Sequence, residues 1–251
     1  MKTSFFIFFL LCFTTFLYAQ DEAEDLLETP KDIPTPMFSL GIEFDVGIPL
    51  NDFNDNLNRL TWGFSGSFLV RTNPAATVPV LLGLSGGAVF YDAEIRDQLI
   101  FIDGYTIEGR STTRNGIFMM HGLLRLLPPV DLPVQPYIDG MFGFKNFYAR
   151  TLIEELNPPD NEEALEDSYI EQGDWALSYG GAVGLQYLVG AGAGIYILLD
   201  VRCVFLKGST ADYLVRNTDP NLQIVDTIDA FEEKKSTTDM LIPQIGVSFV
   251  F

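Results

Sequence analysis

The chain has 251 residues, of which 47% are hydrophobic, and its 15 Lys and Arg stand against 34 Asp and Glu, giving a formal net charge of −19. This apolar fraction, with 21 Phe and 10 Tyr, excludes a disordered chain. A pI near 4.2 argues against nucleic acid as a partner, because phosphate contacts need clustered Lys and Arg. One His and two Cys leave little for a zinc site or a disulfide framework, so we expect no cofactor.

Residues 1–20, MKTSFFIFFLLCFTTFLYAQ, have the pattern of a secretory signal peptide. Lys2 is followed by an apolar run from Phe5 to Leu17 and then by small residues before the expected cut after Ala19 or Gln20. The run is shorter than the roughly 20 residues that a spanning helix needs, so a retained membrane anchor is the weaker alternative. Residues 21–37 are acidic and contain three Pro, which predicts an extended periplasmic lead-in to a barrel domain at 38–251.

From Phe38 onward, apolar and polar residues alternate with a period of two, which predicts an all-β fold. The strands are expected at about 38–48, 62–71, 79–91, 115–127, 134–147, 174–188, 194–206 and 239–251. They are longer than the typical soluble strand of about 5–6 residues, and they match the roughly 9–11 residues that cross a bilayer. An even number of antiparallel strands can close into a barrel without edges.

The alternation also indicates which face points outward. Eight strands enclose an interior that side chains just fill, and the bulky Phe, Trp, Leu and Ile faces do not suit so narrow a lumen. We therefore expect the apolar face toward lipid and the Gly- and Ser-rich face inward. The inward face should carry a lumen charge network of four acids and four bases: Glu43, Asp45, Asp139, Asp200, Arg71, Arg125, Lys145 and Arg202. A soluble barrel or sandwich with solvated polar faces is the alternative.

Connection lengths point the same way. Short connections at about 72–78, 128–133 and 189–193 would be periplasmic turns, and long ones at about 49–61, 92–114, 148–173 and 207–238 would be extracellular loops. Within the second loop, LIFIDGYTIE (99–108) predicts a hairpin around Asp103-Gly104. That hairpin either extends the third and fourth strands beyond the membrane or joins the wall, which would then have ten strands.

These features together resemble the small outer-membrane β-barrel proteins of Gram-negative bacteria. The carriers are the glycine-rich strands PYIDGMFGFKNFY (136–148) and WALSYGGAVGLQY (175–187), LLDVRCVFLKG (198–208), and the ending IPQIGVSFVF. The Ala-Gln end of the signal peptide is similar to those of the Bacteroidota group. The resemblance implies an outer-membrane location, surrounding outer-membrane lipid, and recognition of Phe249 and Phe251 by the barrel-assembly machinery during insertion.

The chemistry of the chain favours a non-enzymatic, structural or interaction role. His121 has no identifiable nucleophile and acid beside it, so we expect a hydrogen-bonded lumen histidine. The acidic loops, which could bind divalent cations or simply repel neighbours, offer a surface for an extracellular or envelope protein partner. Three alternatives remain open: a narrow porin-like channel, an outer-membrane enzyme acting on lipid or peptide, and a soluble periplasmic ligand-binding barrel. An interfacial aromatic girdle is expected from the strand-end residues Trp62, Trp175, Tyr148, Tyr179 and Tyr187.

Overall fold

The structure is a computed structural model, and it describes residues 37–72, 78–102, 105–128, 134–156, 166–192, 194–219 and 226–251. The predicted signal peptide and all of the lead-in except Met37 lie outside these residues, so both stay predictions. No helix in the described ranges is long and apolar enough to cross a membrane.

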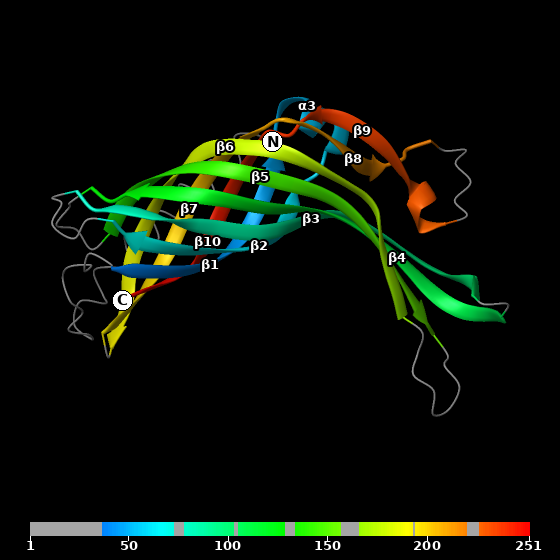
Figure 1. Cartoon of the computed structure of the whole chain (residues 1–251), viewed down its shortest axis with the longest axis horizontal. Helices are drawn as coiled ribbons and strands as arrows, with labels where there is room; N and C mark the ends of the chain where they lie inside the picture. Colours follow the sequence, from blue (N-terminus) through cyan, green and yellow to red (C-terminus); the bar gives the residue numbers. More distant parts are fainter. Residues whose placement is uncertain are drawn as a thin grey trace, which may run out of the picture. The chain divides into compact units, whose positions relative to one another are not determined.

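Eight strands form a closed antiparallel ring in the order β1-β10-β7-β6-β5-β4-β3-β2 (Figure 1). The strands of the ring are β1 (Phe38–Pro49), β2 (Thr61–Arg71), β3 (Val80–Ile102), β4 (Tyr105–Leu126), β5 (Val134–Glu155), β6 (Glu166–Gly192), β7 (Ile195–Gly208) and β10 (Met240–Val250). The seam joins the two ends of the domain, with Ser39 opposite Val250. The predicted eight-stranded barrel is confirmed. The ten-stranded alternative is wrong, because the hairpin at 99–108 continues β3 and β4, with Phe101 opposite Thr106.

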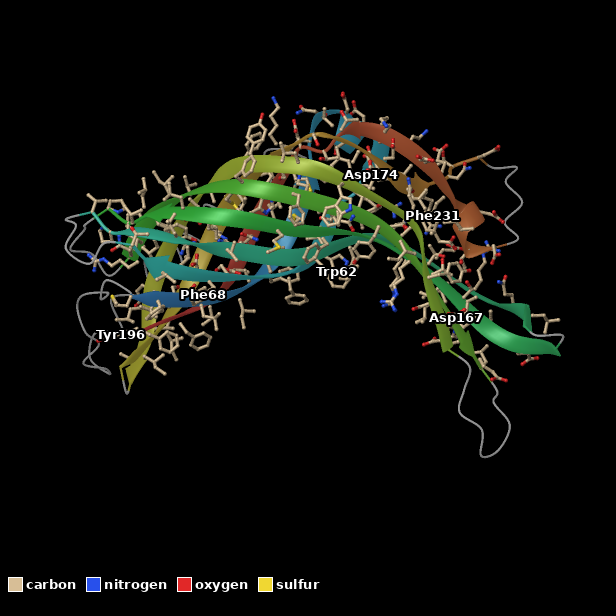
Figure 2. All side chains as sticks on the ribbon, in the orientation of Figure 1. Trp62, Phe68, Asp167, Asp174, Tyr196 and Phe231 are labelled. Carbon is tan, nitrogen blue, oxygen red and sulfur yellow. The ribbon has the colours of Figure 1, made fainter. Side chains whose placement is uncertain are left out.

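The wall has its apolar face outward, as the alternation predicts. Phe142 is 62% exposed and Ile42 is 58% exposed, whereas their chain neighbours Met141 and Glu43 are buried. Trp62 and Phe68 lie on the outside of the wall (Figure 2). So many bulky apolar side chains facing water would forfeit roughly 25 cal/mol for each Å² left exposed, so this face is built for lipid.

Strands β3 to β6 continue well past the wall. Their distal parts, residues 92–102, 105–115, 149–155 and 166–172, pair in the same order and form what we call the projecting sheet (Figure 1). Register shifts between Phe90 and Asp92, and between Ala149 and Arg150, mark β-bulges where the strands leave the wall. Most of the long loops expected at 92–114 and 148–173 are therefore strand rather than loop.

The remaining long connections build a cap at the same end of the barrel. The cap consists of α3 (Asn51–Leu57), β8 (Thr210–Arg216), the 3₁₀ turn η1 (Thr227–Ala230) and β9 (Phe231–Thr237). Strands β8 and β9 form a two-stranded sheet of their own. Phe53 of α3 packs edge-on against Tyr213 of β8 and Phe147 of β5, with ring centroids 5.0 and 5.7 Å apart. This buried aromatic cluster closes the barrel end with apolar packing.

Candidate functional site

A network of buried charges crosses the lumen. Arg125 on β4 donates two hydrogen bonds to the carboxylate of Asp139 on β5, from Nε and Nη2, each 2.8 Å long. Its guanidinium lies 3.6 Å from the ring centroid of Tyr137, and the Tyr137 hydroxyl donates to Asp200 at 2.5 Å. These paired strands place the groups together because inward-facing residues of neighbouring strands meet at the same level of the barrel.

Arg202 on β7 extends the network to the opposite wall. Its Nη2 lies 3.4 Å from Glu43 Oε1 and its Nη1 lies 3.5 Å from Asp139 Oδ2. Its Nε donates to the amide oxygen of Gln244, whose Nε2 in turn donates to Asp45 at 2.6 Å. A chain of polar contacts therefore runs from β4 and β5 through β7 and β10 to β1, tying the walls together across the lumen.

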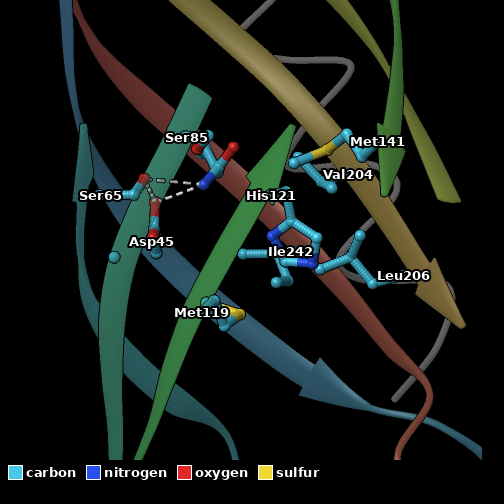
Figure 3. A pocket seen from close by; sticks show the side chains of 11 residues that line it. Asp45, Ser65, Ser85, Met119, His121, Met141, Val204, Leu206 and Ile242 are labelled. Carbon is cyan, nitrogen blue, oxygen red and sulfur yellow. Dashed lines mark hydrogen bonds between the residues drawn. The ribbon is translucent and has the colours of Figure 1, made fainter. Parts of the chain in front are cut away.

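A small cavity lies beside this network. It has a volume of about 20 Å³ and is lined by Asp45, Ser65, His121 and Gln244, among others (Figure 3). Ser65 donates to Asp45 Oδ1 at 2.9 Å, whereas Asp45 Oδ2 is buried without a hydrogen-bond partner. A cavity of this size holds about one water molecule, so the described part of the lumen offers little free space here.

Six of the eight residues predicted for the lumen network meet in the structure, and two lie elsewhere. The six are Glu43, Asp45, Arg125, Asp139, Asp200 and Arg202. Lys145 is fully buried but donates to the backbone carbonyl of Thr238 at 2.5 Å, where the cap joins β10. Arg71 is partly exposed at the far end of β2. The group that meets thus has four acids and two arginines rather than the expected four and four.

Sequence reasoning did not assign several polar residues that complete the network. Gln186 Nε2 and Ser248 Oγ both donate to Asp200 Oδ2, at 2.8 and 3.1 Å, and Ser67 donates to Glu43 at 3.0 Å. With Tyr137 and Gln244, these residues satisfy carboxylate oxygens that the arginines do not reach. All of them lie on the polar faces of predicted strands, so the alternation was the available signal.

His121 forms no catalytic constellation with the groups around it. Its Nε2 lies 3.0 Å from Ser178 Oγ, and both side chains are buried. No carboxylate among the described residues is hydrogen-bonded to the imidazole, so the orienting acid of a Ser-His-Asp arrangement is missing there. The described residues also hold no group of three or more His, Cys, Asp or Glu side chains placed to bind a metal ion.

The cap is attached to the projecting sheet by ion pairs. Arg216 of β8 donates to Asp92 at 2.9 Å and to Glu94 at 2.8 Å, both on β3. The hydrogen bond from Arg216 holds the pKa of Glu94 below its usual value of 4.5. Next to this contact, Ser111, Thr113 and Thr227 are buried and share hydroxyl hydrogen bonds of 2.7–2.9 Å. The cap and the projecting sheet are therefore joined by specific polar contacts.

The surface beyond the wall is strongly acidic. Exposed carboxylates from the projecting sheet and β9 gather there: Asp97, Glu154, Asp167, Glu171 and Glu233 (Figure 2). At the other end of the barrel, Phe251 is 49% exposed and its backbone N–H donates to the carbonyl of Phe38 at 3.0 Å. Recognition of Phe249 and Phe251 during assembly stays a prediction.

No protein-family model and no curated protein matches the chain. Solved structures with a similar fold include Ail, the attachment invasion locus protein of Yersinia pestis, in complex with the heparin analogue sucrose octasulfate, at 10% identity and a TM-score of 0.31 over 85% of this chain and 96% of that one. A major outer membrane protein from Thermus thermophilus has 12% identity and a TM-score of 0.31 over 85% and 99%. The N-terminal β-barrel domain of Pseudomonas aeruginosa OprF has 12% identity and a TM-score of 0.26 over 86% and 100%.

The class of protein follows from the geometry of the wall itself. An eight-stranded antiparallel ring with an apolar exterior and buried, paired charges inside is the architecture of an outer-membrane β-barrel. The chain is thus a small transmembrane β-barrel of the outer membrane.

Proposed function

We propose that this chain is a non-enzymatic outer-membrane protein with a lumen plugged by side chains and a structural or interaction role. The observation that carries the proposal is the filling of the barrel interior. Arg125, Asp139, Asp200 and Arg202 meet across the lumen, and the cap cluster around Phe53 packs over one end. A barrel filled in this way offers no path for solutes, which leaves the part of the chain beyond the wall as its working surface.

In this proposal the short connections face the periplasm, and the projecting sheet and cap face outward. Their acidic character suits a basic or cation-bridged extracellular or envelope partner rather than nucleic acid. The pairing of His121 with Ser178, without an acid hydrogen-bonded to the imidazole, favours this role over a lipid- or peptide-modifying enzyme. The outward apolar face favours it over a soluble ligand-binding barrel.

Single-channel recording in a planar lipid bilayer tests the plugged lumen. We expect the full-length mature protein to insert without discrete conductance steps. As a positive control, the double variant Phe53→Ala and Arg125→Ala removes a cap anchor and the central guanidinium, and it should open a measurable leak. Defined conductance steps from the unaltered protein would replace this proposal with the narrow-channel alternative.

A further inference from the structure

The outward face of the barrel changes character at one row of residues. Along β4 and β5 this face is uncharged through the wall, from Leu126 to Gly116 and from Val134 to Tyr148. Phe118 and Trp175, which are 40% and 59% exposed, form its last lipid-facing level before the projecting sheet, where Asn146 lies between them. The first charged side chains beyond that level are Arg114 and Arg150, both exposed.

These two arginines are direct cross-strand partners. Arg114 of β4 stands opposite Arg150 of β5, which places their Cβ atoms roughly 4.5–5.5 Å apart on one face. Like charges in this position are destabilising. The pairing is unexpected in a chain with 34 acids and 15 bases, where carboxylate partners are abundant.

Neither arginine takes a carboxylate partner among the described residues. Arg150 donates to the neutral hydroxyl of Ser168 at 2.9 Å, and Arg114 makes no side-chain hydrogen bond or ion pair with the described part of the chain. Arg110, on the same strand as Arg114, instead donates to both carboxylate oxygens of Asp97, at 2.7 and 3.0 Å. The Arg114–Arg150 pair therefore holds two adjacent positive charges that nothing described in the molecule neutralises.

A third donor lies beside the pair. Tyr148 is opposite Gly116, one level closer to the wall. A Cβ atom at position 116 would come within 2.6 Å of the Tyr148 hydroxyl oxygen, so the absence of a side chain there lets the phenol lie across β4. Two guanidinium groups and a phenol at one level form a cradle of donors for a tetrahedral oxyanion, and arginine binds phosphate bidentately.

The surroundings of this cradle indicate where the phosphate comes from. Phe118 and Trp175 lie on the membrane side, and Ile95 and Ile170, which are 59% and 69% exposed, flank the arginines on the same face. A ligand that fills this place must have a phosphate next to apolar chains. Phosphate groups of lipids lie at this boundary, where arginine side chains reach from the wall into the headgroup layer.

We propose that Arg114, Arg150 and the Tyr148 hydroxyl bind the phosphate of a lipid headgroup in the leaflet around the cap end of the barrel. This inference rests on the proposed membrane location. Binding of such a lipid removes the repulsion within the arginine pair, and it anchors the base of the projecting sheet at the bilayer surface.

Titration of the protein in maltoside micelles with a phosphomonoester lipid, dilauroyl phosphatidic acid, tests the site, with bound lipid counted by native mass spectrometry. We expect the double variant Arg114→Gln and Arg150→Gln to bind the lipid about tenfold or more weakly. The matched control, Arg110→Gln and Lys235→Gln, removes the same charge from carboxylate-paired residues beyond the membrane, and it should bind as the unaltered protein does. Equal binding by the Arg114/Arg150 variant and the unaltered protein would overturn the site.

Two further readouts separate the explanations. The temperature at which the folded band shifts on a gel should rise with phosphatidic acid in the unaltered protein, and it should neither rise in the Arg114/Arg150 variant nor start lower there. Single Arg114→Gln and Arg150→Gln variants repeat the test with half the change. Inorganic phosphate that binds as tightly as the lipid would overturn the lipid source. A protein without any heat-dependent shift would refute the membrane barrel itself, whereas an intact shift with unaltered lipid binding refutes this site alone.

Discussion

Single residues in the lumen hold charges where no solvent can replace a lost partner. Arg125 and Asp139 have side chains that are 2% and 0% exposed. A buried pair of this kind can be replaced by apolar residues at little cost, but removal of one partner leaves an uncompensated charge. The two kinds of substitution at this pair therefore have very different expected effects.

We expect Asp139→Ala to lower the free energy of unfolding in detergent by about 3–5 kcal/mol, measured by urea titration of the folded gel band. The double variant Arg125→Met and Asp139→Met should recover most of that loss. As a control, Asp97→Ala breaks the exposed pair with Arg110 and should have little effect. A double variant as unstable as Asp139→Ala would contradict the electrostatic explanation.

Gly184 makes room for the network rather than for a turn. A Cβ atom at this position would lie 2.2 Å from Cζ of Tyr137, whose buried ring packs against Arg125. We expect Gly184→Ala to destabilise the barrel by about 1–3 kcal/mol through overpacking, measured by the same urea titration. Gly192→Ala is the matched control, because no heavy atom lies within 4 Å of its added methyl. Equal stability of the two variants would show that Tyr137 can move away without cost.

The sequence alternation identifies which residues enter the lumen but not which ones meet. Glu43 and Asp200 are both correctly placed on inward faces, yet their contacts depend on strand register and on bulges such as the one between Leu188 and Gly190. Register is set by turn geometry, which composition describes poorly. The same limit explains Lys145, whose partner is the backbone of the cap rather than a lumen carboxylate.

At the scale of elements, the eight wall strands were predictable and the parts beyond them were not. The wall strands bury one face and expose the other, so a period of two is enforced along each. The segments at 92–114 and 207–238 are acidic and were read as loops, although much of each is strand. The cap also contains α3, whose seven residues are too few for a clear helical period.

The contact between β8 and β3 should depend on pH through Glu94. Its pKa is lowered in the folded state by the hydrogen bond from Arg216, so its contribution is present above the usual glutamate value of 4.5 and is lost as the pH falls through the lowered pKa. We expect hydrogen exchange in β8 to speed up over that acidic range. Because both side chains are partly exposed, the effect should be about 1 kcal/mol or less.

Two variants test this assignment. Glu94→Gln should remove the acid-dependent part of the change in β8 exchange, whereas Glu232→Gln, which breaks an exposed pair within β9, should keep it. An unaltered pH profile in Glu94→Gln would assign the change to other carboxylates.

At the scale of the whole molecule, the outward apolar face separates a membrane barrel from a soluble one. Phe142 is 62% exposed near the middle of β5 in the wall. On a lipid face, Phe142→Lys should cost roughly 2–4 kcal/mol in a bilayer, measured by unfolding from vesicles. Ile95→Lys, in the projecting sheet and similarly exposed, should cost much less. If Phe142→Lys instead improved solubility without loss of stability, the lipid-facing assignment would be wrong.

The seam between β1 and β10 has a consequence for the kinetics of folding. Because Ser39 pairs with Val250, the ring closes through a contact between the ends of the domain, one of the largest sequence separations it could have. Hairpins such as β3–β4 can form locally and early, but closure must wait until β10 has reached the membrane. A nascent chain that lacks β10 would expose two unpaired strand edges, and the last step of folding should be slow and sensitive to whatever protects those edges.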